Sequence, residues 1–341
     1  MPAKQSPADT LTSGNHVCQP VKTSPPPKQK DKMPNIIAST RHLLHNVKTA
    51  VLEPIYGRRP LKRAEQMFKA SFGRNINWEH PTAFVEKLRW IQFRTDPAMR
   101  TRLADKLAAR DHIISQGLAD ILVPLYGTWE SPHDIPWDEL PRSLVLKTSH
   151  GSGDAIIVHD KDTVDRKTIS RHFSKALAKP YGRYYAETHY KPIPRYILAE
   201  KLLHNDAAFS RSIVDYKFYC CNGNPILCMV CANRTSITSH DMQRFFYDIE
   251  WQRHNDWVTP ATTDDTAVPR PQSLDQMIEI CRRLSKGIPF VRIDLYESDG
   301  ATYFSEFTFS PDAYKPFPIS ETAFAILSEK LELPEPDFNI P

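Results

Sequence analysis

The sequence predicts an α+β fold, in which mixed β-strands are separated by a small number of helices. Short runs rich in Val, Ile, Phe and Tyr recur from about residue 121 onward, and such runs are typical of strands. Helical periodicity dominates the preceding part of the chain and returns between some of the runs. With 341 residues, of which 40% are apolar, the chain can form one large domain or two modest ones.

The amino-terminal part predicts a leader followed by helices. Residues 1–35 are rich in proline and lysine and poor in large apolar residues, so we expect them to be disordered. Residues 36–100 predict a helical region with two apolar stripes, one formed by Ile37, Leu43, Leu44 and Val47 and the other by Phe84, Leu88 and Ile91. A further helix is predicted to start near Asp96 and to continue through Leu103 and Leu107 towards Ile113.

The strands follow in sequence order. They are predicted at 121–127, 143–149, 155–159, 196–203, 214–221, 225–232 and 244–251, with a helix near 169–177. The turn Asn222-Gly223-Asn224 joins two of them as a hairpin. A helix at 273–285 is predicted from its apolar face, from a capping box of Ser273 and Gln276, and from Gly287 as its stop. A second hairpin, 290–296 and 302–310, and a helix at 321–331 complete the pattern.

Charge and cysteine usage exclude several classes of function. The formal charge is +4, but residues 1–40 hold five lysines and two aspartates, which leaves only +1 for the rest. We therefore expect no nucleic-acid partner, although a local basic patch is not excluded. No apolar run approaches the roughly 20 residues that cross a bilayer. The six cysteines follow no signal peptide, which favours the cytoplasm.

Cys228 and Cys231 form a C-x-x-C motif that needs its own interpretation. The apolar run around them has a period of two, which places residues three apart on opposite faces of a strand. A zinc site needs four ligands, and the sequence offers no second pair. We therefore expect both residues to be buried strand cysteines.

A glycine-containing loop is the first candidate for chemistry. Gly151 and Gly153 lie in the segment from Lys147 to Asp154, between two predicted strands. Such a loop can direct several backbone N–H groups at one anion, while the lysine supplies a point charge. A plain hairpin turn that needs glycine for a positive φ explains the same residues.

The second candidate is an acidic pair on the last hairpin. Alternation places Arg292 and Asp294 on one strand face, and Glu306 and Thr308 on one face of the next strand. Two carboxylates on adjacent strands suit Mg²⁺, provided that they share a face. A two-residue turn at Asp299-Gly300 would separate them, so we expect a three-residue loop, 298–300, with a bulge. A solvated hairpin with an Arg–Glu surface pair is the alternative.

Cations on a third strand form the last candidate. Lys217 lies in the predicted strand 214–221, two residues after Asp215, and Arg234 ends its hairpin partner. Basic residues on a sheet can contact phosphates or an acidic substrate, although surface cations are common without such a role.

In their order, the segments from about residue 105 to 311 resemble the ATP-grasp superfamily and, within it, the TupA-like ATP-grasp family of polysaccharide and teichuronopeptide synthesis. The resemblance rests on the ordered series ADKLAARDHIISQGLADILVPLYGTW, LPRSLVLKTSHGSGDAIIV, RYILAEKLL, DYKFYCCNGNP, RFFYDIEW, SKGIPFVRIDLY and YFSEFTFSP. It implies ATP-grasp-like mixed sheets over 101–341. These would comprise a lead-in segment (101–142), a lid subdomain (143–203) and a sheet subdomain with the metal site (204–341).

The resemblance also implies roles for individual residues. Those that bind ATP would be Lys106 and Lys147 at the phosphates, the lid residues His150, Gly151, Ser152 and Gly153, the adenine hinge with Glu200, Lys201 and Leu203, and Asp206 at the ribose. Those near the transferred phosphate would be Lys217, Arg234 and Arg292. Mg²⁺ would be held by Asp294 and Glu306, with Thr308 where many such enzymes have asparagine. A threonine hydroxyl is a poorer ligand than an amide oxygen, which leaves a second metal position open.

The function implied is ATP- and Mg²⁺-dependent activation of a carboxylate and its ligation to an amine on a glycan or glycan precursor. Peripheral association with a membrane glycan assembly complex would be compatible with it.

A glycosyltransferase is the alternative, because Asp160 and Asp162 form a D-x-D motif, although a charged turn explains them as well. A non-catalytic nucleotide-binding module is a third possibility, suggested by Thr308. The aromatic and basic stretch 181–195 predicts either a saccharide groove or a packed connector.

Overall fold

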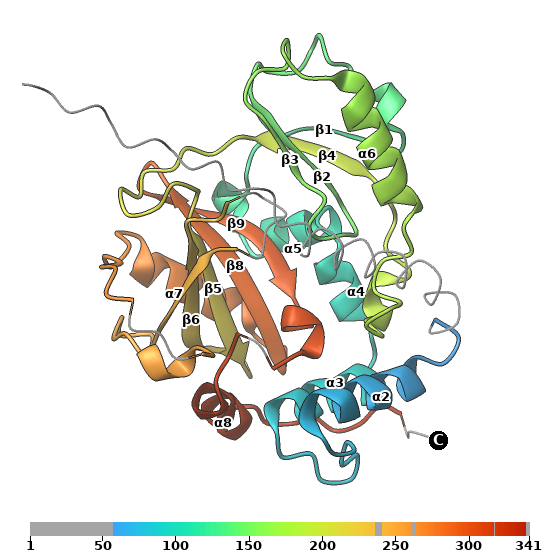
Figure 1. The fold of residues 1–341 in the computed structure, drawn as a ribbon, viewed down its shortest axis with the longest axis vertical. Helices are drawn as coiled ribbons and strands as arrows, with labels where there is room; N and C mark the ends of the chain where they lie inside the picture. Colours follow the sequence, from blue (N-terminus) through green and yellow to red (C-terminus); the bar gives the residue numbers. More distant parts are fainter. Residues whose placement is uncertain (1–56, 236–240, 261–263, 317, 339–341) are drawn as a thin grey trace, which may run out of the picture. The chain divides into compact units, whose positions relative to one another are not determined.

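A computed structural model of the chain describes residues 57–235, 241–260, 264–316 and 318–338 (Figure 1). These residues belong to one compact unit, Lys48–Pro341. The predicted leader and the first apolar stripe, from Ile37 to Val47, lie outside the described residues. Within the described residues, helices combine with two antiparallel sheets, which confirms the α+β class.

From residue 57 onward, four helices precede the sheets: α2 (Pro60–Phe72), α3 (Phe84–Arg94), α4 (Ala98–Ala104) and α5 (Ala108–Ser115). The single helix predicted from Asp96 to Ile113 is wrong, because the chain leaves the helical conformation at Asp105 (ψ 115°). The carboxylate of Asp105 accepts the N–H of Leu107 at 2.9 Å and holds this break. Lys106 therefore lies between two helices, where its side chain is free to point away from both.

A four-stranded antiparallel sheet, which we call the lid sheet, has the order β1-β4-β2-β3. Its strands are β1 (Leu125–Trp129), β2 (Leu144–Thr148), β3 (Ile156–Val158) and β4 (Ile197–Lys201), and α6 (Arg166–Ala178) packs on it through Ile169 and Phe173 (Figure 1). The strand predicted at 121–127 begins later, because 119–121 forms a 3₁₀ turn. Since β1 belongs to this sheet, the sheet extends into the segment 101–142.

The larger sheet has five antiparallel strands in the order β7-β6-β5-β8-β9. They are β5 (Asp215–Cys221), β6 (Asn224–Ala232), β7 (Gln243–Tyr247), β8 (Phe290–Ser298) and β9 (Ala301–Thr308). The strand predicted over 244–251 ends at Tyr247, where Asp248 accepts the N–H of Gln252 and turns the chain. Asn222 (φ 47°) and Gly223 (φ 83°) form the predicted turn between β5 and β6.

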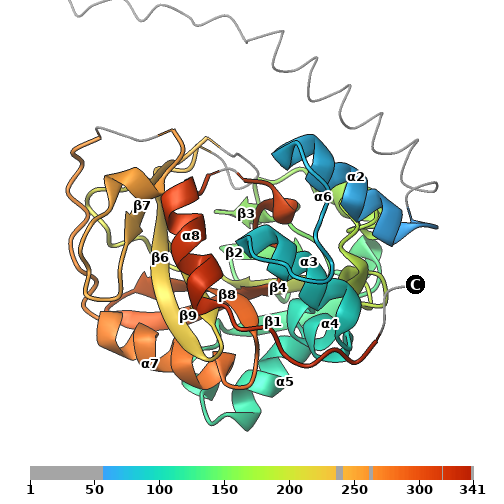
Figure 2. The same ribbon diagram turned by 90° about the horizontal axis from the view of Figure 1, so that it is seen from below.

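Helices cover both faces of this sheet. Cys228 packs in the core cluster that includes α7 (Leu274–Ser285), and Cys231 packs in the cluster that includes α3 and α8 (Glu321–Lys330). Both thiols are buried and free, which confirms the prediction of strand cysteines on opposite faces. Helices α3 and α8 lie side by side (Figure 2) and cover one face of β5 and β6 at the end that carries Tyr219 and Cys221.

The predicted capping box of α7 is wrong. Ser273 is the N-cap residue, but its hydroxyl accepts nothing from the helix. Both the backbone N–H and the hydroxyl of Ser273 donate to the carboxylate of Glu297 on β8, because a charged acceptor forms the stronger hydrogen bonds. Gln276 instead accepts from the hydroxyl of Thr302. The helix nevertheless ends at Ser285, before Gly287 (φ 76°), as predicted.

Candidate active site

The acidic pair of the last hairpin shares one sheet face, but the irregularity that allows this lies within a strand and not in the turn, where it was predicted. Asp299 (φ 51°) and Gly300 (φ 71°) form a two-residue turn, so Ser298 pairs with Ala301, and the expected three-residue loop is wrong. The register shifts further along, at Ser305, so that Asp294 pairs with Glu306. This bulge restores the shared face that two metal-binding carboxylates would need.

The three residues Lys217, Asp294 and Glu306 form a row across the adjacent strands β5, β8 and β9. Lys217 pairs with Asp294, and Asp294 pairs with Glu306, so all three side chains leave the sheet on the same side. Asp294 is fully buried. Its two oxygens accept from Arg292 Nε at 2.7 Å, from Arg292 Nη2 at 2.8 Å and from Lys217 Nζ.

These contacts decide the charge states in the row. Burial acts to raise the pKa of the Asp294 carboxyl, but Arg292 and Lys217 outweigh it and lower that pKa. Burial likewise acts to lower the pKa of the Lys217 ammonium, but Asp215 and Asp294 raise it. Asp294 and Lys217 are therefore both charged near neutral pH.

The ion pairs continue in both directions along the sheet. On one side, Asp215 Oδ2 lies 3.5 Å from Lys217 Nζ and 2.8 Å from Arg234 Nη2. On the other side, Glu306 Oε1 lies 3.7 Å from Arg292 Nη2. Thr308 accepts from Arg292 Nη2 at 3.1 Å and donates to Glu306 Oε1 at 3.3 Å, so its hydroxyl positions Glu306.

Lys106 joins this row to the glycine loop. Its Nζ lies 3.8 Å from Glu306 Oε2 and donates to the backbone carbonyl of Gly151 at 2.6 Å. A continuous series of contacts therefore runs from Arg234 to Gly151. Its four cations, Lys106, Lys217, Arg234 and Arg292, alternate with the three carboxylates of Asp215, Asp294 and Glu306.

The glycine loop between β2 and β3 is closed by its own side chains. Asp154 accepts from the backbone N–H and the hydroxyl of Thr148. A Cβ at Gly151 would lie 2.8 Å from Asp154 Oδ2 and 2.8 Å from Thr148 Oγ1, so a larger residue there would displace one of these side chains. Ser152 and Gly153 at its tip are exposed.

We expect Gly151→Ala to open this loop, because its methyl group would displace the hydrogen bond between Thr148 and Asp154. Nucleotide affinity, measured by isothermal titration with MgATP, should fall about tenfold, equivalent to the loss of one hydrogen bond. Gly73→Ala is the matched control, because Gly73 (φ 72°) has a positive φ but no atom within 4 Å of the place that a methyl group would take. Equal effects of the two substitutions would show that the space at Gly151 is irrelevant.

The second lysine that the resemblance places at the phosphates has a different partner. Lys147 Nζ lies 2.6 Å from Glu200 Oε2, and Arg110 Nη1 lies 3.6 Å from Glu200 Oε1. Glu200 and Lys201 end β4, Leu203 follows it, and the N–H of Lys201 donates to the carbonyl of Pro124. The structure thus brings Lys147 to Glu200 at the end of β4, while Lys106 contacts Glu306.

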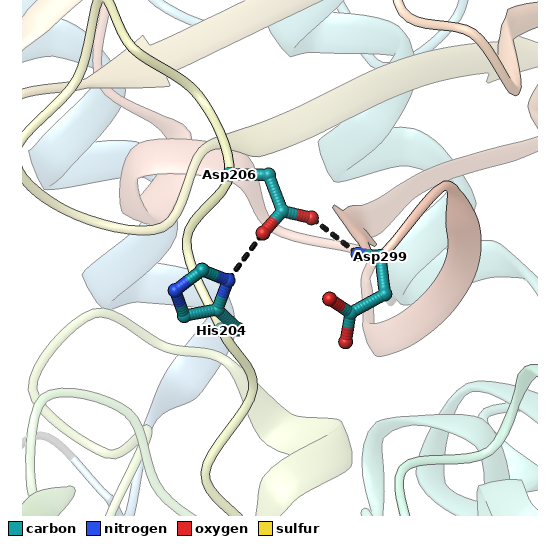
Figure 3. A group of neighbouring side chains, drawn as sticks. All are labelled: His204, Asp206 and Asp299. Atoms are coloured by element: carbon teal, nitrogen blue, oxygen red, sulfur yellow. Dashed lines mark hydrogen bonds and ion pairs between the residues drawn. The ribbon is translucent and has the colours of Figure 1, made fainter.

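Asp206 lies in the segment between β4 and β5, and its carboxylate contacts the turn between β8 and β9 (Figure 3). Its carboxylate accepts the backbone N–H of Asp299 and pairs with the ring of His204. The three side chains are exposed and close enough to hold a cation, but hydrogen bonds within the group already account for their proximity. The carboxylate that was expected at the ribose therefore supports a turn.

His150 has the geometry of a structural residue. It is buried, and burial together with Arg195 lowers its pKa to about 4, so its ring is neutral near pH 7. Among the residues that the structure describes, its Nδ1 finds no hydrogen-bond partner. A histidine that stays neutral to pH 4 is a weak base, so the structure supports no general base in the loop.

Glu187 is a buried residue that the sequence analysis did not single out. Its Oε1 accepts from the hydroxyl of Ser310, at the end of β9, at 2.6 Å. Burial raises its pKa to about 7, although Ser310 and Arg89 act in the opposite direction. The only sequence signal was an isolated acid in the basic stretch 181–195.

We expect Glu187 to make stability depend on pH. Its pKa in the folded state, about 7, exceeds its ordinary value of 4.5, so between these values the folded state binds the extra proton and stability falls as pH rises. The melting temperature of Glu187→Gln should therefore rise relative to that of wild type between pH 4.5 and about pH 7, and the difference should then stay constant up to pH 8. Thermal melts of both proteins across this pH range measure the difference. Glu329→Gln, at an exposed site, should show no such divergence.

The residues at the acidic pair fit Mg²⁺, which prefers oxygen ligands together with substrate phosphates. Glu306 is 27% exposed, and its cation contacts exceed 3.5 Å, so its oxygens are accessible. Both oxygens of Asp294 are already hydrogen-bonded to cations, so Asp294 would join a metal only if Lys217 or Arg292 moved. The fit is therefore better at Glu306 than at Asp294.

The D-x-D motif forms a charged turn after β3. Asp160 accepts from Arg142 Nη2 at 2.6 Å and from the N–H of Asp162 at 3.0 Å. These contacts engage the carboxylate that a metal–diphosphate complex would need.

The stretch 181–195 is largely a packed connector. Arg63 stacks on Tyr184, Lys315 lies over Tyr185, and the guanidinium of Arg89 donates to the carbonyl of Tyr185. A cavity of about 480 Å³ lies beside its end, lined in part by Thr101, Asp105 and Pro192–Pro194.

Comparison with known proteins identifies the family. The family model described as TupA-like ATPgrasp matches residues 86–328. No curated protein matches the sequence. Solved structures with partial similarity include the D-alanine–D-alanine ligase of Bacillus anthracis in complex with ATP (TM-score 0.40, 14% identity, 67% of this chain), of which the match spans slightly less than two thirds, 65%. Another is the D-alanine–D-alanine ligase of Helicobacter pylori, with a TM-score of 0.39 and 12% identity over 74% of this chain and 68% of that chain. A third is the RimK domain ATP-grasp protein of Sphaerobacter thermophilus, with a TM-score of 0.38 and 14% identity over 69% of each chain.

Proposed function

The chain belongs to the TupA-like ATP-grasp family, whose model matches more than two thirds of it, and we propose that it is an ATP- and Mg²⁺-dependent ligase. Its substrates would be a carboxylate and an amine, one of them carried by a glycan or glycan precursor. The observation that carries the proposal is the series of ion pairs from Arg234 to Lys106, which ends on the backbone of the glycine loop.

In this proposal the chain's residues act by position and charge. Lys106 and the loop residues hold the phosphates, with Lys147 at the hinge side. Lys217, Arg234 and Arg292 neutralise charge that develops on the transferred phosphoryl group. Glu306, supported by Asp294 and Thr308, would hold Mg²⁺, which supplies further neutralisation of the phosphate charge when bound.

The proposed reaction has two steps, phosphoryl transfer to the carboxylate and attack of the amine on the acyl phosphate. A carboxylate oxygen attacks the γ-phosphorus, the bond from that phosphorus to the β,γ-bridging oxygen breaks, and ADP leaves with the bonding electrons. The amine nitrogen then attacks the carbonyl carbon of the acyl phosphate, the C–O bond to phosphate breaks, and inorganic phosphate departs. The nitrogen loses its proton to water or phosphate, since no side chain is assigned as base.

The test has a binding arm and a turnover arm. Millimolar MgATP should raise the melting temperature, since a ligand at about 100 times its dissociation constant stabilises by roughly 2.7 kcal/mol. ADP should then accumulate only when a uronic acid sugar and an amine are both present. Absence of any thermal shift in wild type would overturn the proposal.

A non-catalytic nucleotide-binding module is the second candidate, favoured by the engagement of both Asp294 oxygens with cations. It predicts a thermal shift with MgATP and no ADP release with any pair of substrates. Substrate-dependent ADP release would exclude it.

We also place the protein in the cytoplasm, where ATP is available. The five cysteines within the described residues are free, which supports a reducing compartment. Within the same residues, no helix combines the length and apolarity needed to cross a bilayer.

A further inference from the structure

The chain forms an uncommon turn directly after the strand that carries Glu306 and Thr308. Strand β9 ends at Thr308, and Asp312 (φ 49°), Ala313 (φ 54°) and Tyr314 (φ 63°) then follow one another in the left-handed region. Figure 1 shows the chain passing from β9 straight into this turn. Residues with a Cβ rarely adopt this backbone conformation, and three in succession cost free energy. Strained backbone of this kind concentrates at functional sites.

Buried contacts hold the turn in this conformation. The hydroxyl of Ser310, where the turn begins, donates to buried Glu187 at 2.6 Å, and the N–H of Ala313 donates to the carbonyl of Ser310 at 3.0 Å. At the other end, the guanidinium of the buried Arg89 lies 3.7 Å from the centre of the Tyr314 ring. The turn is therefore fixed at both ends, which offsets the cost of its backbone.

This conformation exposes one carboxylate, that of Asp312, near the end of the row of ion pairs. Tyr314 of the same turn is buried, whereas Asp312 is exposed. Burial acts to lower the pKa of the Arg292 guanidinium, but Asp294 and, with a smaller effect, Asp312 raise it. Burial raises the pKa of the Tyr219 hydroxyl, and Asp312 adds to that effect. The Asp312 carboxylate thus lies close enough to Arg292 to interact with its charge.

A carboxylate at this place suits an ammonium group. A primary amine is protonated near neutral pH, and Arg292 would repel it as it approached the transferred phosphate. The carboxylates beside Arg292 are engaged otherwise, because Asp294 is buried between two cations and Glu306 is the proposed ligand of Mg²⁺. Asp312 is a further carboxylate next to Arg292, and its exposure lets a substrate reach it.

We propose that Asp312 binds the ammonium group of the amine substrate and thereby selects a charged primary amine. This assignment rests on the proposed ligase function. The contact would be a charge-assisted hydrogen bond, which is stronger than one between neutral groups. The bound ammonium group loses one proton to water, and its nitrogen then attacks the carbonyl carbon of the acyl phosphate. The C–O bond to phosphate breaks, and the second proton leaves the nitrogen after the attack.

The test compares two amines that match in size but differ in charge. Ethylamine is protonated near neutral pH, whereas methoxyamine has the same number of non-hydrogen atoms and is uncharged. ADP formation is measured with each amine at saturating MgATP and glucuronate. Asp312→Asn should lower kcat/KM for ethylamine about tenfold or more, chiefly through KM, because an amide forms no charge-assisted bond. Its kcat/KM for methoxyamine should equal that of wild type.

Two further variants control for the backbone. Asp299→Asn makes the same substitution at another exposed aspartate with a positive φ (51°), in the turn before β9, and should leave both values unchanged. Asp312→Gly removes the carboxylate and places at this position the residue that best tolerates a positive φ. It should lose activity with ethylamine as Asp312→Asn does, with a urea midpoint no lower than that of wild type.

Equal losses with the two amines in Asp312→Asn, or a loss with neither, would overturn the proposal and leave Asp312 as a partner that only balances the charge of Arg292. Activity of wild type with methoxyamine alone would overturn it as well. Failure of the ligase assignment gives a different result, because wild type would then release no ADP with either amine, and this proposal would fall with it.

Discussion

Asp294→Asn is expected to destabilise the protein by about 3–5 kcal/mol, the usual cost of leaving buried charges without their partner. Asp294 is fully buried and accepts three hydrogen bonds from Arg292 and Lys217. An amide has nearly the same shape but no charge, so both buried cations would lose their nearest carboxylate and keep only the longer contacts of Lys217 with Asp215 and of Arg292 with Glu306. Urea denaturation followed by circular dichroism measures the change.

Asp160→Asn provides the comparison, because Asp160 forms an ion pair with Arg142 at the surface, where solvent screens the interaction. The urea midpoint of Asp160→Asn should shift far less than that of Asp294→Asn. Comparable urea midpoints for the two variants would mean that the buried ion pairs of Asp294 contribute nothing to folding stability.

Glu306→Gln is expected to separate catalysis from stability. Glu306 is partly exposed, and its nearest cations lie at 3.7 and 3.8 Å, so the fold should tolerate the loss of its charge. As the most accessible carboxylate for Mg²⁺, it should nevertheless be needed for turnover. We expect kcat/KM for ADP formation to fall about 100-fold or more, with an unchanged urea midpoint.

Glu329→Gln is the control for this substitution, since Glu329 is exposed on α8 and remote in sequence from the row. It should leave both readouts unchanged. Full activity in Glu306→Gln would remove Glu306 from the metal site and leave Asp294 as the remaining carboxylate of the pair.

Local patterns in the sequence predicted most of the strands. The alternation around Cys228 and Cys231 placed these residues on opposite faces of β6, because side-chain direction in a strand depends only on the backbone period. The turn at Asn222-Gly223 followed from two residues that tolerate positive φ. Such features need no knowledge of distant partners.

The features that were missed depend on distant or competing contacts. Ser273 bonds to Glu297 of another strand instead of to its own helix, and propensity cannot reveal that partner. The three-residue break at 105–107 and the one-residue bulge at Ser305 each interrupt a regular pattern. Both irregularities lie next to the candidate site, where local rules are most often broken.

The candidate site was partly predictable. Asp294 and Glu306 emerged from alternation on two strands, and the structure pairs them. Lys106 entered only through the family resemblance, because nothing in its neighbourhood marks the helix break that frees it.

We propose that the glycine loop, Lys106 and Glu306 contact the phosphates of one nucleotide. A crystal structure with Mg²⁺ and a non-hydrolysable ATP analogue would show whether they do. We predict the terminal phosphate within about 2.7–3.2 Å of Lys106 Nζ, and Mg²⁺ at about 2.0–2.1 Å from a Glu306 oxygen. A nucleotide bound away from the loop at Gly151, with Glu306 free of metal, would contradict the claim.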